Sequence, residues 1–138
     1  MYVIIGGAYN GKRSYVDRLI TTMENKETIY CDGSLPEIIQ ASTNKRYVIS
    51  RFEEIVKPYL HLKEEEVASQ IAGHILTISK QTEIICICTD MSRGVVPLEK
   101  EARQLRDTCG RVYQQLCQNA NTVIRVWYGI PQYLKGEQ

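Results

Sequence analysis

The distribution of apolar positions along the chain predicts alternating strands and helices. Short runs of β-branched and aromatic residues are typical of buried strands, whereas apolar residues repeated every three or four positions indicate helices. The strand pattern occurs at 2–5, 28–31, 46–50, 83–88 and 122–128. Helical spacing occurs at 15–23, 64–79 and 97–120, and shorter helices are predicted at 35–41 and 51–57.

This alternation predicts an α/β domain with about five mostly parallel strands and helices on both faces. Parallel strands need crossover connections, which bring helices onto the two faces of the sheet, and ligands bind beyond the carboxyl ends of the strands. The length of 138 residues suits one domain over 1–138. We see no repeat or linker that would divide it.

The segment between the first strand and the first helix has the pattern of a phosphate-binding loop. Its residues Gly6, Gly7, Ala8, Tyr9, Asn10, Gly11 and Lys12 read G-x-x-x-x-G-K. Glycines let backbone N–H groups converge on phosphate oxygens, while the lysine and the helix start add positive charge. We therefore predict a P-loop NTPase-like fold that binds ATP or GTP, with Lys12 as a catalytic residue. An ordinary glycine-rich turn is the alternative.

The positions that would hold Mg²⁺ depart from this pattern. Arg13 replaces the Ser or Thr that usually follows the lysine, and Ser14 is turned away by one helical step of about 100°. Ser50 ends the strand that should end in Asp. Arg13 and Ser14 are still predicted to belong to the nucleotide-binding loop, and Arg13 is a candidate phosphate contact. Glu53 or Glu54 could supply a carboxylate, although a solvated helix face explains both glutamates more simply. We predict no metal-binding residue, and the need for Mg²⁺ stays open.

A polar loop and a polar helix face follow the fourth strand. Thr89 to Pro97 are predicted to form a loop at the carboxyl edge of the sheet, beside the phosphate loop. On the next helix Arg103 and Asp107 are four residues apart, with Arg106 alongside. A solvated face with a simple ion pair and an additional substrate site are both compatible with this spacing.

Separated motifs in a fixed order resemble the adenosylcobinamide kinase/adenosylcobinamide-phosphate guanylyltransferase family. They are Gly6–Lys12, Gly94–Pro97, Ala102-Arg103, Arg106-Asp107, Gly110, Gln114, Gly129–Pro131 and Leu134-Lys135. The first thirty residues and Ile84 to Lys135 carry the resemblance, and the middle of the chain is shorter and matches poorly. The resemblance implies cobalamin biosynthesis: phosphorylation of the aminopropanol hydroxyl of adenosylcobinamide by ATP or GTP, then GMP transfer through a histidine. It also implies a homo-oligomer, with a ring-shaped trimer as the family's arrangement.

The resemblance assigns roles to individual residues. Lys12 and the loop glycines match phosphate-binding residues, and Asp90 matches an acidic, catalytic position after the fourth strand. The stretch that matches the segment of the transfer histidine, residues 32–45, contains no histidine, so guanylyl transfer is expected to be lost. Of the two histidines, His74 borders an apolar stripe and is predicted to be packed and hydrogen-bonded, and His61 to face solvent.

Charge and composition exclude several classes of partner. The 17 Lys and Arg residues nearly balance the 16 Asp and Glu, which argues against nucleic acid or an anionic membrane as partner. No signal sequence and no membrane-length apolar stretch is found, so we expect a cytoplasmic protein. The five cysteines lack C-x-x-C spacing and are predicted to be reduced structural residues: Cys31, Cys86, Cys88, Cys109 and Cys117.

Two main functions are compatible with the sequence. In a phosphotransferase, Lys12 would hold the nucleotide, Asp90 would orient the hydroxyl or a metal, and Arg103 or Arg106 would offset developing charge. A non-catalytic nucleotide- or corrinoid-binding homologue would instead explain the substitutions on the metal side and the missing histidine. A purely structural subunit is a third, simpler interpretation.

Overall fold

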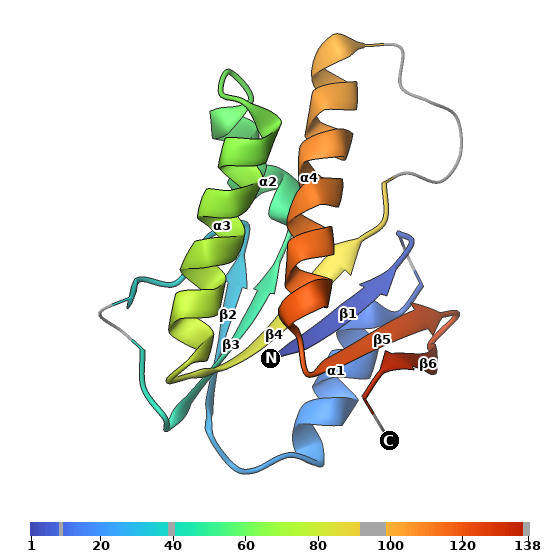
Figure 1. Ribbon diagram of the computed structural model, residues 1–138. Helices are drawn as coiled ribbons and strands as arrows, with labels where there is room; N and C mark the ends of the chain where they lie inside the picture. Colours follow the sequence, from blue (N-terminus) through green and yellow to red (C-terminus); the bar gives the residue numbers. More distant parts are fainter. Residues whose placement is uncertain (9, 39–40, 92–98, 137–138) are drawn as a thin grey trace.

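A computed structural model describes residues 1–8, 10–38, 41–91 and 99–136 (Figure 1). In this part of the chain the centre is a six-stranded sheet in the order β2-β3-β4-β1-β5-β6. The strands are β1 (Tyr2–Gly6), β2 (Glu27–Asp32), β3 (Lys45–Ser50), β4 (Glu83–Thr89), β5 (Thr122–Trp127) and β6 (Ile130–Lys135). All neighbouring strands are parallel except β5 and β6. The predicted α/β class with a mostly parallel sheet is confirmed.

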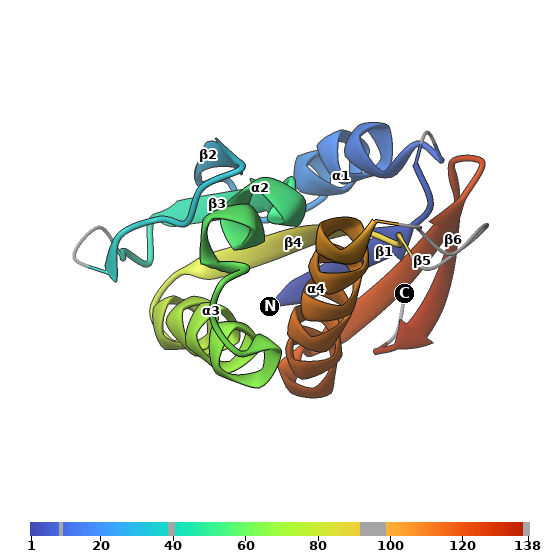
Figure 2. The same ribbon diagram turned by 90° about the horizontal axis from the view of Figure 1, so that it is seen from above.

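Helices cover both faces of this sheet, as the sequence predicts. They are α1 (Lys12–Thr21), α2 (Phe52–Val56), α3 (Glu64–Ser79) and α4 (Lys100–Asn119), with a 3₁₀ turn at Lys57–Tyr59. Helix α1 packs on one face, and α2, α3 and α4 pack on the other (Figure 2). Figure 1 shows α3 and α4 running side by side across that second face.

The central strands are apolar on both faces because both faces are covered. In β4, the side chains of Ile85 and Ile87 pack on the α1 face, and those of Ile84, Cys86 and Cys88 pack beneath α3 and α4. Such continuous burial leaves no polar alternation along the strand. It explains why this segment reads as an unbroken apolar run in the sequence.

The sixth strand was not predicted. Strand β6 pairs antiparallel with β5 across a two-residue turn, in which Tyr128 and Gly129 have φ values of 51° and 74°. Positive φ at both central residues is the geometry of a type I′ turn. Such a turn favours glycine at its second central residue, which is Gly129 here. Pro131 obscures the strand in the sequence, but proline is tolerated at the edge of a sheet, where β6 lies.

The helix predicted at 35–41 is wrong over residues 35–37, which are irregular. Residues 39 and 40 lie outside the described residues. This segment is held by a tertiary contact instead: His74 Nε2 donates to the carbonyl oxygen of Pro36 at 2.6 Å. The predicted hydrogen-bonded state of His74 is thus confirmed, and His61 is exposed as predicted. Helix α4 begins at Lys100, whereas Pro97, the predicted start, lies outside the described residues.

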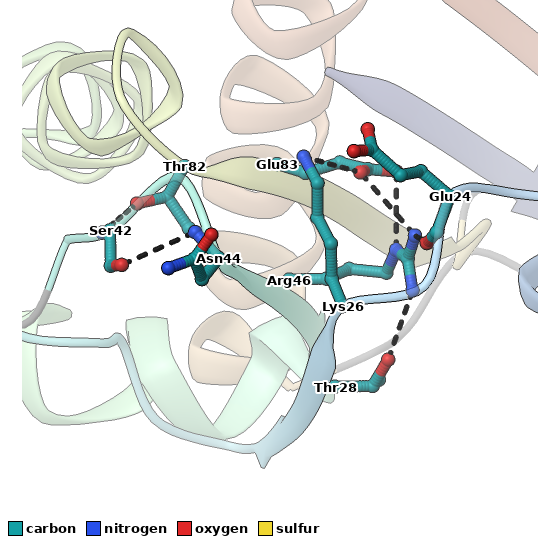
Figure 3. A network of polar contacts seen from close by, with 8 residues as sticks. All are labelled: Glu24, Lys26, Thr28, Ser42, Asn44, Arg46, Thr82 and Glu83. Carbon is teal, nitrogen blue, oxygen red and sulfur yellow. Dashed lines mark hydrogen bonds and ion pairs between the residues drawn. The ribbon is translucent and has the colours of Figure 1, made fainter.

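A buried arginine joins three strands at the amino end of the sheet (Figure 3). Arg46 is 1% exposed and donates from Nε to Glu83 Oε1 at 3.1 Å, from Nη1 to Thr28 Oγ1 at 3.1 Å and from Nη2 to the Glu24 carbonyl at 2.7 Å. Lys26 Nζ lies 3.3 Å from the other Glu83 oxygen. Each donor group of this guanidinium therefore has an acceptor, as a buried charge requires.

The cysteines behave as the sequence predicts. All five are free, and burial raises the pKa of the Cys86 and Cys109 thiols to about 12. Thiols with such a pKa stay protonated at neutral pH and react slowly. In the described part of the chain, no helix is long and apolar enough to cross a membrane.

Candidate functional site

The phosphate loop connects β1 directly to α1 at the carboxyl edge of the sheet. Strand β1 ends at Gly6, α1 begins at Lys12, and Gly11 between them has a φ of 83°. This left-handed conformation is one that glycine adopts without steric strain. Tyr9 lies outside the described residues. The loop thus leads from a buried strand into a helix whose amino end points at the loop, which is the arrangement that binds anions.

Neighbouring strands hold the two ends of this loop. The Asp90 amide donates to the Gly6 carbonyl at 2.8 Å, and a Cβ at Gly6 would lie 2.5 Å from the Val126 carbonyl oxygen. At the other end, the Gly129 amide donates to the Asn10 carbonyl at 2.8 Å. The β5–β6 turn, which contains Gly129, therefore supports the phosphate loop from one side.

Replacing Gly6 by alanine is expected to destabilise the fold by about 1–3 kcal/mol, because the added methyl group would collide with backbone that cannot move easily. Gly73 is the matched control: it lies inside α3 with open space around it, and Gly73→Ala should stabilise by up to about 1 kcal/mol. Urea unfolding of both variants measures the difference. Equal stability of the two variants would contradict the close approach at Gly6.

Lys12 lies beneath the loop. Its side chain is part of the buried interior, with the residue 7% exposed, and Nζ donates to the Gly7 carbonyl at 2.6 Å. Burial lowers the pKa of Lys12 below its ordinary value, while Cys88, Asp90 and Glu53 act in the opposite direction. These neighbours therefore offset only part of the cost of burying the ammonium charge, and a bound phosphate would stabilise that charge further.

The two glutamates of α2 lie in different environments. Glu54 is 3.8 Å from Arg51 and 3.7 Å from Lys57, so the solvated-face interpretation fits it. Glu53 is half-buried and acts electrostatically on Lys12 and also on the side chain of Tyr113. A carboxylate supplied by Glu53 to the phosphate site therefore stays a prediction.

Arg13 does not extend freely into the phosphate site. Its Nη1 donates to Asp32 Oδ1 at 3.2 Å, and its guanidinium carbon lies 4.0 Å from the centre of the Tyr30 ring. Ser50 donates its hydroxyl proton to the same Asp32 carboxylate. The sequence analysis did not select Asp32. The available signal was its position at the end of a strand, which is the same feature that drew attention to Ser50. Ser14 is exposed.

Two clefts, each of about 360 Å³, flank the loop. The polar cleft is lined by residues that include Lys12, Arg13, Ser14, Asp32, Ser50 and Thr89. The other is mainly apolar and is lined by residues that include Gly7, Asp90, Tyr113, Gln114, Trp127 and Leu134. The structure thus places Lys12 in the polar cleft and Asp90 in the apolar one. Asp90 lies there with Gln114 and Leu134, which carry part of the resemblance, and with Tyr113 and Trp127, which sequence reasoning did not select.

The polar residues predicted on α4 lie elsewhere. Arg106 pairs with its neighbour Asp107, with Nη2 2.9 Å from Oδ1. Among the described residues, those lining the two clefts do not include Arg103, Arg106 or Asp107. Helix α4 instead contributes residues about two and three turns further along, Tyr113, Gln114 and Cys117, to the apolar cleft.

Comparison with known proteins agrees with this architecture. The model of the cobinamide kinase / cobinamide phosphate guanyltransferase family matches residues 27–134, which include the middle of the chain and begin after the phosphate loop. No curated protein matches the chain. The loop at 6–12 therefore supports the assignment independently of the match. The chain belongs to the cobinamide kinase / cobinamide phosphate guanyltransferase family, which links it to cobalamin biosynthesis and to nucleoside triphosphate substrates.

Proposed function

We propose that this protein is a kinase that transfers the terminal phosphoryl group of ATP or GTP to the aminopropanol hydroxyl of cobinamide. The observation that carries this proposal is the buried Lys12 beneath a glycine-rich loop, at the start of α1. Backbone N–H groups of such a loop hold the phosphates, and the lysine reaches the β- and γ-phosphates. Family membership supplies the acceptor.

The apolar cleft is the proposed site of the acceptor arm. Lys12 Nζ lies at the Gly7 carbonyl, so the terminal phosphate is expected at this end of the loop. The apolar cleft begins at Gly7 and Asp90. Its volume of about 360 Å³ suits the aminopropanol arm, while the much larger corrin ring would remain outside. Asp90 would then orient the hydroxyl group for attack.

We propose that guanylyl transfer is lost. Residues 32–45 contain no histidine. The imidazole of His74 is bound to the Pro36 carbonyl through Nε2, and His61 is exposed just after the 3₁₀ turn. Neither histidine lines the two clefts in the described part of the chain. A covalent GMP intermediate on a histidine therefore has no support at this site.

Incubation with cobinamide and ATP or GTP, followed by mass spectrometry, tests the proposal. We expect cobinamide phosphate and no GDP-cobinamide. Gln114→Trp should fill the apolar cleft and raise KM for cobinamide by about tenfold, with little effect on KM for nucleotide. Gln118→Trp, an exposed position on the same helix, is the matched control and should change neither.

Three results would contradict these proposals. Absence of cobinamide phosphate with both nucleotides would exclude the kinase activity. A Gln114→Trp variant with an altered KM for nucleotide alone would show that the apolar cleft does not hold the acceptor. Formation of GDP-cobinamide would show that guanylyl transfer persists.

A non-catalytic nucleotide-binding homologue is the second candidate. It is favoured by Arg13 and Ser50, which occupy the positions where active P-loop enzymes hold their metal. Tight nucleotide binding, abolished by Lys12→Ala but without any turnover of cobinamide, would identify this function.

A further inference from the structure

The residue after the phosphate-loop lysine supplies a fixed cation rather than a metal ligand. The Arg13 guanidinium lies 3.2 Å from Asp32 Oδ1, 3.6 Å from Asp17 Oδ1 and over the ring of Tyr30. It also lines the polar cleft together with Lys12. These contacts hold a second positive charge beside the loop lysine at the mouth of that cleft.

The Asp32 carboxylate already binds the Arg13 guanidinium. Asp32 and Ser50 are register partners at the carboxyl ends of β2 and β3, and the Ser50 hydroxyl donates to the Asp32 carboxylate. This hydrogen bond, followed by Arg13, lowers the pKa of Asp32. The carboxylate thus stays ionised and accepts from both neighbours through one oxygen, Oδ1.

These residues do not fit the Mg²⁺ ion that P-loop phosphotransferases ordinarily use. Mg²⁺ requires a near-octahedral set of oxygens at about 2.0–2.1 Å and is bound by carboxylates or hydroxyls beside the phosphates. Here Arg13 replaces the hydroxyl ligand, and Ser50 is a donor to Asp32.

We propose that Arg13 takes the place of the divalent cation, so that this protein binds nucleotide phosphates with two fixed cations, Lys12 and Arg13, and without Mg²⁺. A guanidinium binds phosphate oxygens through paired N–H donors, which is a stronger interaction than its exposed ion pair with Asp32. Asp32 and Tyr30 act as positioning residues that aim the guanidinium at the polar cleft. The inference rests on the proposed function, because it requires a nucleotide in loop 6–12.

Calorimetric titration with the β,γ-imido analogues of ATP and GTP, in Mg²⁺ or in EDTA, tests this inference. We expect the wild-type Kd to differ by no more than about threefold between the two conditions, the scale of a weak surface interaction. Arg13→Gln should weaken binding about tenfold or more in EDTA, in line with the loss of charge-assisted hydrogen bonds. Arg18→Gln, an exposed position on the same helix, is the matched control and should leave Kd unchanged.

A variant that restores the usual metal ligands sharpens the test. Arg13→Thr combined with Ser50→Asp should make binding depend on Mg²⁺, with affinity about tenfold or more higher in Mg²⁺ than in EDTA. Melting temperatures of each variant establish that the fold is kept.

The outcomes separate this inference from the proposed function. Wild-type binding that requires Mg²⁺ and disappears in EDTA would overturn the role of Arg13 while leaving the nucleotide site intact. A restored double variant that remains indifferent to Mg²⁺ would also overturn it. Absence of binding under both conditions would refute the proposed function, and the inference with it.

Discussion

Lys12→Ala is expected to lower kcat/KM for nucleotide-dependent phosphorylation by about a hundredfold or more, which is the loss typical when one charge-stabilising group is removed from a reacting centre. The physical reason is that Lys12 is 7% exposed and its Nζ lies at the Gly7 carbonyl in a part-buried position, so its charge acts on phosphate with less screening by water than on the surface. Initial-rate kinetics and calorimetric titration with nucleotide measure the effect.

The same lysine predicts a pH dependence of nucleotide binding. Burial lowers the pKa of Lys12 in the free protein, and a bound phosphate favours the protonated form. Affinity should therefore be highest below this lowered pKa and should fall as the pH rises through it, with proton uptake on binding. In Lys12→Arg the charge persists, so this fall should vanish.

Lys63→Ala, at an exposed position just before α3, is the matched control for Lys12→Ala. It should retain both affinity and turnover. If Lys12→Ala kept wild-type affinity and rate while remaining folded, the phosphate loop would not be the nucleotide site. A pH profile that is the same in Lys12→Arg and wild type would exclude Lys12 as the titrating group.

Arg46→Ala is expected to destabilise the protein by about 3–5 kcal/mol, the range found when one partner of a buried ion pair is removed. Arg46 is 1% exposed and donates to Glu83, Thr28 and the Glu24 carbonyl, so its loss leaves several acceptors without a donor (Figure 3). Lys26 still pairs with Glu83 and limits the damage. Urea unfolding at neutral pH measures the change.

An exposed ion pair provides the comparison. Arg111 lies 3.1 Å from Glu64, but its side chain is 46% exposed, and Arg111→Ala should cost less than about 1 kcal/mol. The double variant Arg46→Met with Glu83→Leu should recover part of the stability lost in Arg46→Ala, because apolar residues of similar size replace both charges, although Lys26 then loses its partner Glu83. A loss in Arg46→Ala no larger than in Arg111→Ala would contradict a stabilising role of the buried pair.

The elements with strong local patterns were predictable. Strands β1 and β4 and helix α3 are buried by a regular set of apolar residues, so their periodicity follows directly from packing on the sheet. The glycine-rich loop also has a local signature. The irregular segment at 35–37 did not, because its conformation is set by the contact between His74 and the Pro36 carbonyl, 38 residues apart in the chain.

The sequence by itself determined the α/β class, the phosphate loop, the absence of a histidine in 32–45 and the altered residues on the metal side. Tertiary structure alone decided what these residues touch. Parallel register places the ends of β2 and β3 side by side, which joins Asp32 to Ser50 and gives Arg13 its partner. Likewise, the apolar cleft is lined by residues of β1, β4, α4, β5 and β6, which only the tertiary structure brings together. Contacts between residues far apart in the chain have no periodic signal, because they depend on strand order and register rather than on local spacing.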